Sequence, residues 1–233
     1  MKRILTAWTL VLTLSLTLLS PAIALAPDDI SNGSPSGLVA AGDGGYLMTD
    51  VFNNVIWKVA ADGTVTRCVG QISVSDLGGE PIGTVSDGTA ATALFMEPWG
   101  IAPFLDGYLV SEPDANVIRY FDSAAVQTAA GTGEEGCKDG AAPTATFFSP
   151  TGLAADDQGN VYIADTGNGA IRLITKDGKV STVFTGLNDP TGLFWKDGAL
   201  YICETGAHCI SKIEDGKRTV LSGAEDAEGY TDG

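Results

Sequence analysis

One pattern recurs four times along this chain of 233 residues. Each copy begins with Pro-x-Gly, carries an acidic residue 14 or 15 residues after the proline, and has an isoleucine six residues after the acid. The prolines are Pro35, Pro98, Pro150 and Pro190; the acids are Asp50, Glu112, Asp165 and Glu204; the isoleucines are Ile56, Ile118, Ile171 and Ile210. Four matches at fixed offsets establish an internal repeat, which restricts the fold to an array of similar units.

Each unit is expected to form four short strands. In the third unit these are residues 152–155, 160–165, 170–175 and 179–184, joined by turn-forming segments such as Lys176-Asp177-Gly178. The second strand is apolar at consecutive positions, which is typical of a strand covered on both faces. We therefore predict an all-β fold, a β-propeller of four-stranded antiparallel blades. A two-sheet sandwich is the alternative, but it gives no reason for the sequence to repeat.

The third unit resembles an NHL repeat. The resemblance rests on Ser149-Pro150-Thr151-Gly152-Leu153-Ala154, on 159–168 and on Ile171-Arg172-Leu173-Ile174, and it extends with lower fidelity to all four units. The units span about 35–71, 97–133, 149–186 and 189–222. This resemblance implies a ring that commonly has six blades. NHL propellers include binding scaffolds, extracellular sensor modules and a few enzymes.

Two inserts, 72–96 and 134–148, separate the early units. Each contains Asp-Gly, with the glycine ten residues before the next repeat proline, and Ala93 and Phe95 of the first insert match Ala145 and Phe147 of the second. Residues 228–233 look like the same insert up to its Asp-Gly. We therefore expect residues 35–233 to be four blades of a six-bladed ring, truncated at the C-terminus. A complete four-bladed ring is the alternative.

The chain begins like an exported protein. Lys2 and Arg3 precede an apolar run over 4–19 and an Ala-x-Ala site, which predicts a signal peptide over 1–24 followed by a linker over 25–34. The expected location is secreted, extracellular or in the cell envelope, and no membrane span is expected in the mature protein. The net charge of −16 repels phosphate backbones, so no nucleic-acid partner is expected.

The four repeat acids are the candidate metal ligands. Asp50, Glu112, Asp165 and Glu204 occupy equivalent corners, and a ring of carboxylates could bind Ca²⁺. The alternative is that each carboxylate caps its own hairpin by accepting backbone N–H bonds from the next loop. Because the acid recurs in every unit and is a signature of the NHL fold, we favour the structural role.

No catalytic set stands out in the sequence. His208 is the only histidine and aligns with turn residues, and a multi-histidine zinc site cannot be built from it. A lactonase-type Glu, Asn and Asp set could be drawn from Glu112, Asn116 and Asp165, but nothing marks it out. We therefore assign no catalytic residue and no cofactor, with Ca²⁺ left open.

Two cysteines flank one turn of the fourth unit. Facing positions across a hairpin are close enough for a bridge, so we predict a disulfide between Cys203 and Cys209. Four free thiols are the alternative. The redox states of Cys68 and Cys137 are not assigned.

The leading functional hypothesis is a secreted binding, scaffold or sensor module. It would bind a protein, peptide or glycan on its loop face. The alternative is a propeller hydrolase or lyase, lactonase-like or amidating-lyase-like, with a metal in the central channel. If the ring is open, apolar faces of the first and fourth units should be solvated, with Leu47, Trp57, Phe194 and Tyr201 as candidates.

Overall fold

The computed structural model describes residues 33–71 and 83–223, which form four antiparallel sheets. In each sheet the strands pair in sequence order, so each sheet is one blade of a propeller. The first blade is β1 (Pro35–Ala40), β2 (Tyr46–Asp50), β3 (Val55–Val59) and β4 (Val65–Val69); the second is β5 (Ile101–Phe104), β6 (Gly107–Glu112), β7 (Val117–Phe121) and β8 (Val126–Ala130). The third is β10 (Pro150–Ala155), β11 (Val161–Asp165), β12 (Ala170–Ile174) and β13 (Lys179–Thr185); the fourth is β14 (Pro190–Lys196), β15 (Ala199–Glu204), β16 (Cys209–Glu214) and β17 (Lys217–Gly223).

The predicted all-β fold with four-stranded antiparallel blades is confirmed. One blade departs from the prediction, because β9 (Gly140–Ala141) from the second insert pairs with β13 and adds a fifth strand to the third blade. The signal peptide and linker predicted for residues 1–34 lie almost entirely outside the described residues, as does the insert-like segment 228–233.

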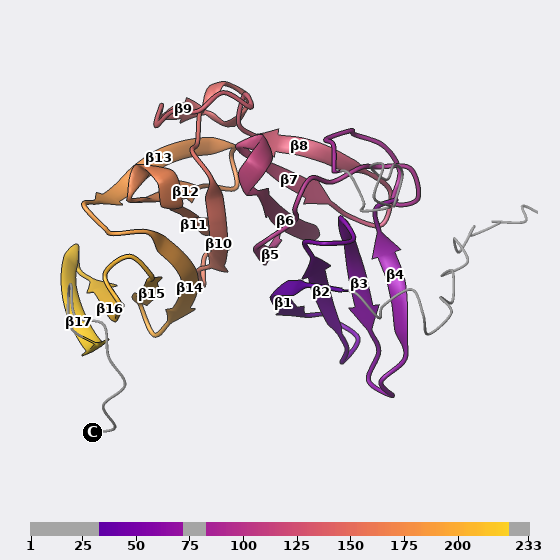
Figure 1. Cartoon of the computed structure of the whole chain (residues 1–233), viewed down its shortest axis with the longest axis horizontal. Helices are drawn as coiled ribbons and strands as arrows, with labels where there is room; N and C mark the ends of the chain where they lie inside the picture. Colours follow the sequence, from indigo (N-terminus) through magenta and orange to yellow (C-terminus); the bar gives the residue numbers. More distant parts are fainter. Residues whose placement is uncertain (1–32, 72–82, 224–233) are drawn as a thin grey trace, which may run out of the picture.

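The four blades follow one another in an arc (Figure 1). The innermost strands of consecutive blades contact each other: β1 with β5, β5 with β10, and β10 with β14. Between the first and fourth blades the arc is open in this view.

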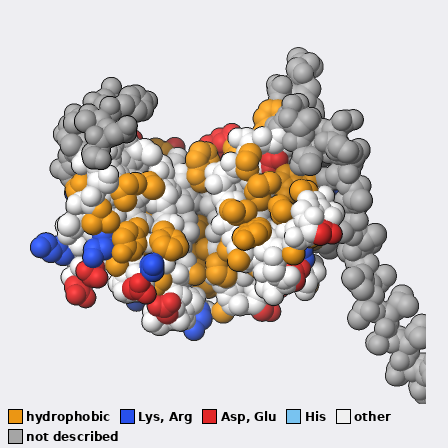
Figure 2. All heavy atoms as spheres, turned by 90° about the horizontal axis from the view of Figure 1, so that it is seen from below, with side chains coloured by type: hydrophobic (Ala, Val, Ile, Leu, Met, Phe, Trp, Pro, Cys, Tyr) orange, Lys and Arg blue, Asp and Glu red, His pale blue; other side chains and the backbone are white. Residues whose placement is uncertain are grey.

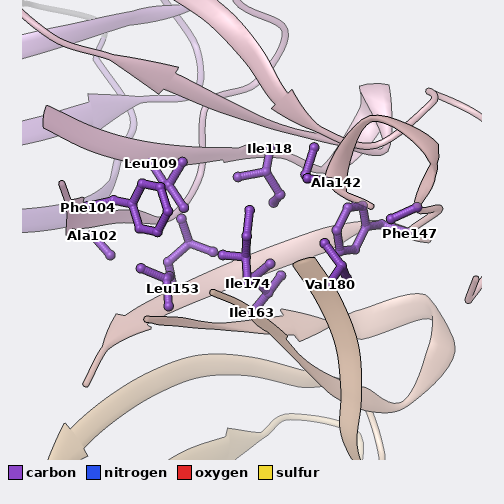
Figure 3. Close-up of a cluster of buried hydrophobic side chains, with 13 residues drawn as sticks. Ala102, Phe104, Leu109, Ile118, Ala142, Phe147, Leu153, Ile163, Ile174 and Val180 are labelled. Atoms are coloured by element: carbon purple, nitrogen blue, oxygen red, sulfur yellow. The ribbon is translucent and has the colours of Figure 1, made fainter. Parts of the chain in front are cut away.

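The core lies between the blades. The largest cluster joins the second and third blades: Leu109 and Ile118 of one sheet pack with Leu153, Ile163 and Ile174 of the next (Figure 3). A second cluster joins the first and second blades, and a third joins the third and fourth. Each blade is therefore stabilised mainly by its neighbours, as expected for a repeat architecture.

Two of the four apolar side chains expected at bare faces are buried. Leu47 is 4% exposed because it packs in the cluster shared by the first and second blades. Trp57 is fully buried, and its Nε1 donates to the buried carboxylate of Asp50. Phe194 is 60% exposed as expected, and Tyr201 beside it is half-buried.

Candidate functional site

Each repeat acid is the last residue of the second strand of its blade. The acids end β2, β6, β11 and β15, where each strand lies opposite the start of the innermost strand or of the loop before it. All four are 1% exposed or less. Because a buried carboxylate must be paired or hydrogen-bonded, the donors around each acid define its role.

Asp165 joins three segments of the third blade. It accepts hydrogen bonds from the backbone N–H of Phe148 (2.8 Å), from Nδ2 of Asn168 (2.8 Å) and from Nη1 of Arg172 (2.7 Å). Phe148 lies two residues before Pro150, so the carboxylate ties the end of β11 to the start of β10. Arg172 and Asp165 form an ion pair in which both side chains are fully buried.

Glu112 makes the equivalent contacts in the second blade. Its carboxylate accepts from the backbone N–H of Met96 (3.0 Å) and from Nη1 of Arg119 (2.9 Å), again as a fully buried ion pair. Both arginines follow their acid by seven residues. This offset is a repeated feature that the sequence analysis missed, and the spacing alone could have revealed it.

The arginine of the third blade also holds the second insert. Arg172 Nη2 donates to Asp139 Oδ1 (2.9 Å) and to the Lys138 carbonyl (3.0 Å), and the Asp139 carboxylate accepts from the Thr182 backbone N–H (3.0 Å). The Phe147 ring centroid lies 5.1 Å from the guanidinium carbon. The Asp-Gly and Ala-x-Phe features of the insert therefore clamp it to the outer strands of the following blade.

The first insert is held in the same way by the second blade. Arg119 Nη2 donates to Asp87 Oδ1 (2.8 Å), the Thr128 backbone N–H donates to the same oxygen (2.9 Å), and the Phe95 ring centroid lies 5.4 Å from the guanidinium carbon. The two clamps use the same chemistry at equivalent positions.

The end blades satisfy their acids with different donors. Asp50 accepts from Trp57 Nε1 (2.8 Å) and Asn53 Nδ2 (2.7 Å). Glu204 accepts from the Ser211 hydroxyl and from Arg218 Nε (2.7 Å), which reaches in from β17. Both carboxylate oxygens of every repeat acid thus accept at least one hydrogen bond from the protein itself.

The surroundings shift the pKa values of the four repeat carboxyls in opposite directions. Burial raises the pKa of Glu112 to about 7, although Arg119 opposes the shift. Burial also raises the pKa of Asp165. At Asp50 and Glu204 burial acts in the same sense, but hydrogen bonds outweigh it and the pKa of each carboxyl is lowered.

These contacts support the structural role of the repeat acids. One detail of that prediction is corrected: the backbone donors come mainly from the residues just before the innermost strand. Among the described residues, Asn53 alone donates its backbone N–H from the loop after the acid. The described residues contain no group of three or more His, Cys, Asp or Glu side chains placed to hold a metal ion. Ca²⁺ binding by the four acids stays an untested hypothesis.

Three polar residues lie at the equivalent turn after the acid, each with a positive φ: Asn54, Asn116 and His208. His208 therefore has the turn conformation expected of it. The two asparagines do more, because Asn54 Oδ1 accepts from the Glu97 backbone N–H (2.7 Å) and Asn116 Oδ1 from that of Ser149 (2.8 Å). Asn116, a member of the possible lactonase-type set, thus joins consecutive blades.

The strand register does not place Cys203 and Cys209 at facing positions. Cys203 lies opposite Ile210, and Cys209 lies opposite Glu204. Because successive residues of a strand point to opposite faces, the two thiols lie on different sides of the sheet, one exposed and one buried. No disulfide joins them in the described part of the chain, and the facing-position reasoning behind that bridge does not hold.

A cavity of about 520 Å³ lies between the start of β1 in the first blade and the start of β14 in the fourth, beside Trp99. It is lined from the first blade by Ser34, Pro35, Ser36 and Val51, from the second by Trp99, and from the fourth by Thr191, Gly192, Cys203 and Thr205. Ser36, Trp99 and Thr191 are the variable middle residues of Pro-x-Gly. The cavity is therefore built where the repeats differ, and none of its lining side chains is an acid, a lysine, an arginine or a histidine.

Two curated proteins are similar in sequence to parts of this chain. The chain is 35% identical over 114 residues to Protein SUPPRESSOR OF QUENCHING 1, chloroplastic, of Arabidopsis thaliana, covering 46% of this chain and 11% of that protein. It is 30% identical over 161 residues to Teneurin-1 of Caenorhabditis elegans, covering 67% of this chain and 6% of that protein. The chain thus matches a small part of each relative.

Among the described residues, no helix is long and apolar enough to cross a membrane.

Solved propellers share the fold at low sequence identity. A streptogramin B lyase superposes with a TM-score of 0.56 at 16% identity, covering 84% of this chain and 57% of that one. The corresponding values are 0.58, 18%, 83% and 66% for a chain of a nidogen/laminin complex. For a putative gluconolactonase they are 0.54, 12%, 81% and 63%. At these identities the likeness establishes the fold alone.

The family model described as NHL repeat matches residues 147–172. This segment runs from Phe147 of the insert clamp through Asp165 to Arg172, so it contains the buried ion pair described above. The chain therefore carries an NHL repeat in the third of its four blades and has the β-propeller fold.

Proposed function

We propose that this chain is a binding module that holds an uncharged segment of a partner protein in the cavity of about 520 Å³ between the first and fourth blades, with Trp99 as the anchor. The observation that carries the proposal is that equivalent and variable repeat residues have different roles. The equivalent acids form internal bonds that hold blades and inserts together, whereas the variable middle residues of Pro-x-Gly line the cavity.

The chemistry of the cavity suits such a ligand. The Trp99 side chain is 38% exposed although it lies among innermost strands, and a partly exposed tryptophan in a concave site is a typical anchor for a binding partner. Hydroxyls of Ser36, Thr191 and Thr205 line the same cavity. Those of Thr191 and Thr205 donate to the Cys203 and Asp189 carbonyls, so they can accept hydrogen bonds from the N–H groups of a peptide.

Relatives of the same fold support the proposal without deciding it. One structure with this fold is a chain of a nidogen/laminin complex, which favours a protein partner. The lyase and the putative gluconolactonase have the same fold and favour the alternative, an enzyme. Acid–base chemistry at this cavity has one titratable side chain to use, the Cys203 thiol, which is a poor basis for a hydrolase or a lyase.

The predicted signal peptide would place this binding site outside the cytoplasm. Secretion is part of the proposal and has its own test. N-terminal sequencing of protein recovered after expression in a secreting host should find Leu25 as the first residue. Recovery of an intact Met1 in the cell pellet would contradict secretion.

The binding proposal is tested by selection from a phage-displayed library of random peptides. Peptides selected on the wild-type protein alone should bind the wild type in calorimetry and lose at least tenfold in affinity with Trp99→Ala. Leu105→Ala is the matched control, since Leu105 is 63% exposed in the β5–β6 turn, at the opposite end of the second blade's strands. Binders that are indifferent to Trp99→Ala would contradict the site, and so would a selection that yields only charged peptides.

A further inference from the structure

The interfaces between consecutive blades differ in what fills them. The first insert adds Ala93 and Phe95 to the core cluster between the first and second blades. The second insert adds Ala142 and Phe147 to the cluster between the second and third (Figure 3). The third and fourth blades have no insert between them, because β13 and β14 are joined by residues 186–189 alone.

A cavity of about 180 Å³ lies at this interface without an insert. Its lining is mainly apolar and aromatic, and it includes Tyr162 and Val183 of the third blade and Trp195 of the fourth. The rings of Tyr162 and Trp195 stack with their centroids 5.1 Å apart, so one wall of the cavity is aromatic. Both walls belong to consecutive blades.

The cavity occupies the place that Ala142 fills at the preceding interface. Ala142 belongs to the same cluster as Ala130 and Ile174, and its backbone N–H donates to the Gly178 carbonyl (2.8 Å). By strand register, the counterparts of these three neighbours at the next interface all line the cavity: Phe184, Ile213 and Gly216. The space that holds insert residues in one interface is therefore hollow in the next.

A backbone donor at this interface is also without an insert carbonyl. At the earlier interfaces the Gln71 N–H donates to the Ala93 carbonyl and the Thr132 N–H to the Ala145 carbonyl, each at 3.1 Å. Gly186 has the equivalent place after β13, and its N–H donates no hydrogen bond within the described part of the chain. A Cβ added to Gly186 would meet no atom within 4 Å, so the space beside it is open.

Val183 lacks the contact that its equivalents make. It is the extra residue at the bulge of β13, as Cys68 is in β4 and Ala129 in β8. Cys68 and Ala129 pack against the clusters that contain insert residues. Val183 is 44% exposed and lines the cavity, so an apolar group placed there would cover it.

The fourth blade determines which charges suit a ligand at this place. Ser211 lies seven residues after Glu204, where the two preceding blades have the arginines that bind the insert aspartates. An aspartate in the ligand would have no such partner, and Asp215 of the cavity lining would repel it. Charged side chains of both signs lie along the lower edge of the half that carries the fourth blade, at the left of Figure 2. We therefore expect an apolar group, and not a charge, to select the ligand.

We propose that this cavity binds a polypeptide segment of a partner protein in the place that the inserts fill at the other two interfaces. One aliphatic or aromatic side chain of the segment enters the cavity, which is large enough for a ring-sized group. A carbonyl of the segment accepts from the Gly186 N–H, as the insert carbonyls do from the equivalent donors. The site shares no lining residue with the cavity beside Trp99, and the inference does not rest on the function proposed for that cavity.

Calorimetry with a synthetic peptide tests this assignment. The peptide is residues 140–147 of this chain with Ala142→Leu, blocked at both ends, and it should bind at least about tenfold more tightly than the same peptide with Ala142→Asp. The protein variants Val183→Asp and Val183→Lys should each weaken its binding at least about tenfold, because either charge would lie against the apolar side chain. Val183 is partly exposed, so circular dichroism should show unchanged folding.

The matched control is Leu105→Asp, which is 63% exposed in the second blade and should bind the peptide like the wild type. Trp99→Ala should also leave the affinity unchanged, so failure of the Trp99 site would not affect this result. The inference is overturned if the peptide fails to bind at about 1 mM, binds Val183→Asp as tightly as the wild type, or loses affinity with Trp99→Ala. Binding of indole without binding of the peptide would also overturn it, because the cavity would then be a site for a small ring compound.

Discussion

Replacing Arg172 by methionine tests whether the repeat acids are structural centres of the blades. The substitution keeps a flexible unbranched apolar stem and removes the guanidinium, leaving the Asp165 carboxylate fully buried without its charged partner. Removal of one member of a buried ion pair costs about 3–5 kcal/mol. The same change removes the guanidinium donors to Asp139 and to the Thr146 and Lys138 carbonyls, so the upper part of that range is expected.

Urea unfolding followed by tryptophan fluorescence measures this loss. The double variant Arg172→Met/Asp165→Asn should recover at least about half of the lost free energy, since no uncompensated buried charge remains. The control is Lys212→Met, which breaks a surface ion pair with Glu214 and should cost less than about 1 kcal/mol. A loss below about 1 kcal/mol for Arg172→Met, or no recovery in the double variant, would refute the structural role.

Three further predictions follow from the same contacts. Since burial holds the pKa of Glu112 near 7, above its unfolded value, its contribution to stability is complete below about pH 4.5 and is lost as the pH rises to 7; Glu112→Gln should flatten this part of the stability profile, which amounts to about 3 kcal/mol in urea titrations. Gly152→Ala should lower the melting temperature by several degrees more than Gly192→Ala, because only Gly152 faces the backbone of a next blade; equal effects would contradict the inter-blade contact. Non-reducing peptide mapping should find Cys203 alkylated by iodoacetamide in the native protein and no Cys203–Cys209 cystine, whereas a recovered cystine would show that the register at this hairpin differs from the structure.

The fold could be predicted from the sequence because the repeat is written at fixed offsets. Pro-x-Gly, the acid and the isoleucine mark the start of one strand, the end of the next and the inter-blade contact, and local turn chemistry supplies the rest. The strands expected at 152–155, 160–165, 170–175 and 179–184 lie within a residue or two of β10 to β13. A repeat at fixed offsets can be recognised in the sequence without knowledge of long-range contacts.

The roles of the inserts could not be predicted in this way. Their shared features, Asp-Gly and Ala-x-Phe, were visible, but their partners Arg119 and Arg172 lie 32 and 33 residues further along the chain. The cavity beside Trp99 could not be predicted from the sequence either, because it brings together Ser36, Trp99 and Thr191 from three separate blades. The facing-position argument for the disulfide failed because of the strand register, where a shift of one residue reverses the side of the sheet.

Calcium titration by calorimetry, on protein freed of metal with EGTA, tests the central claim most directly. If the four repeat acids serve the fold, Ca²⁺ should give no saturable heat at millimolar concentration, and Asp165→Asn should change stability without changing the titration. Stoichiometric Ca²⁺ binding that is abolished by Asp165→Asn would contradict the account, because the carboxylates would then form a metal site instead of the internal bonds described here.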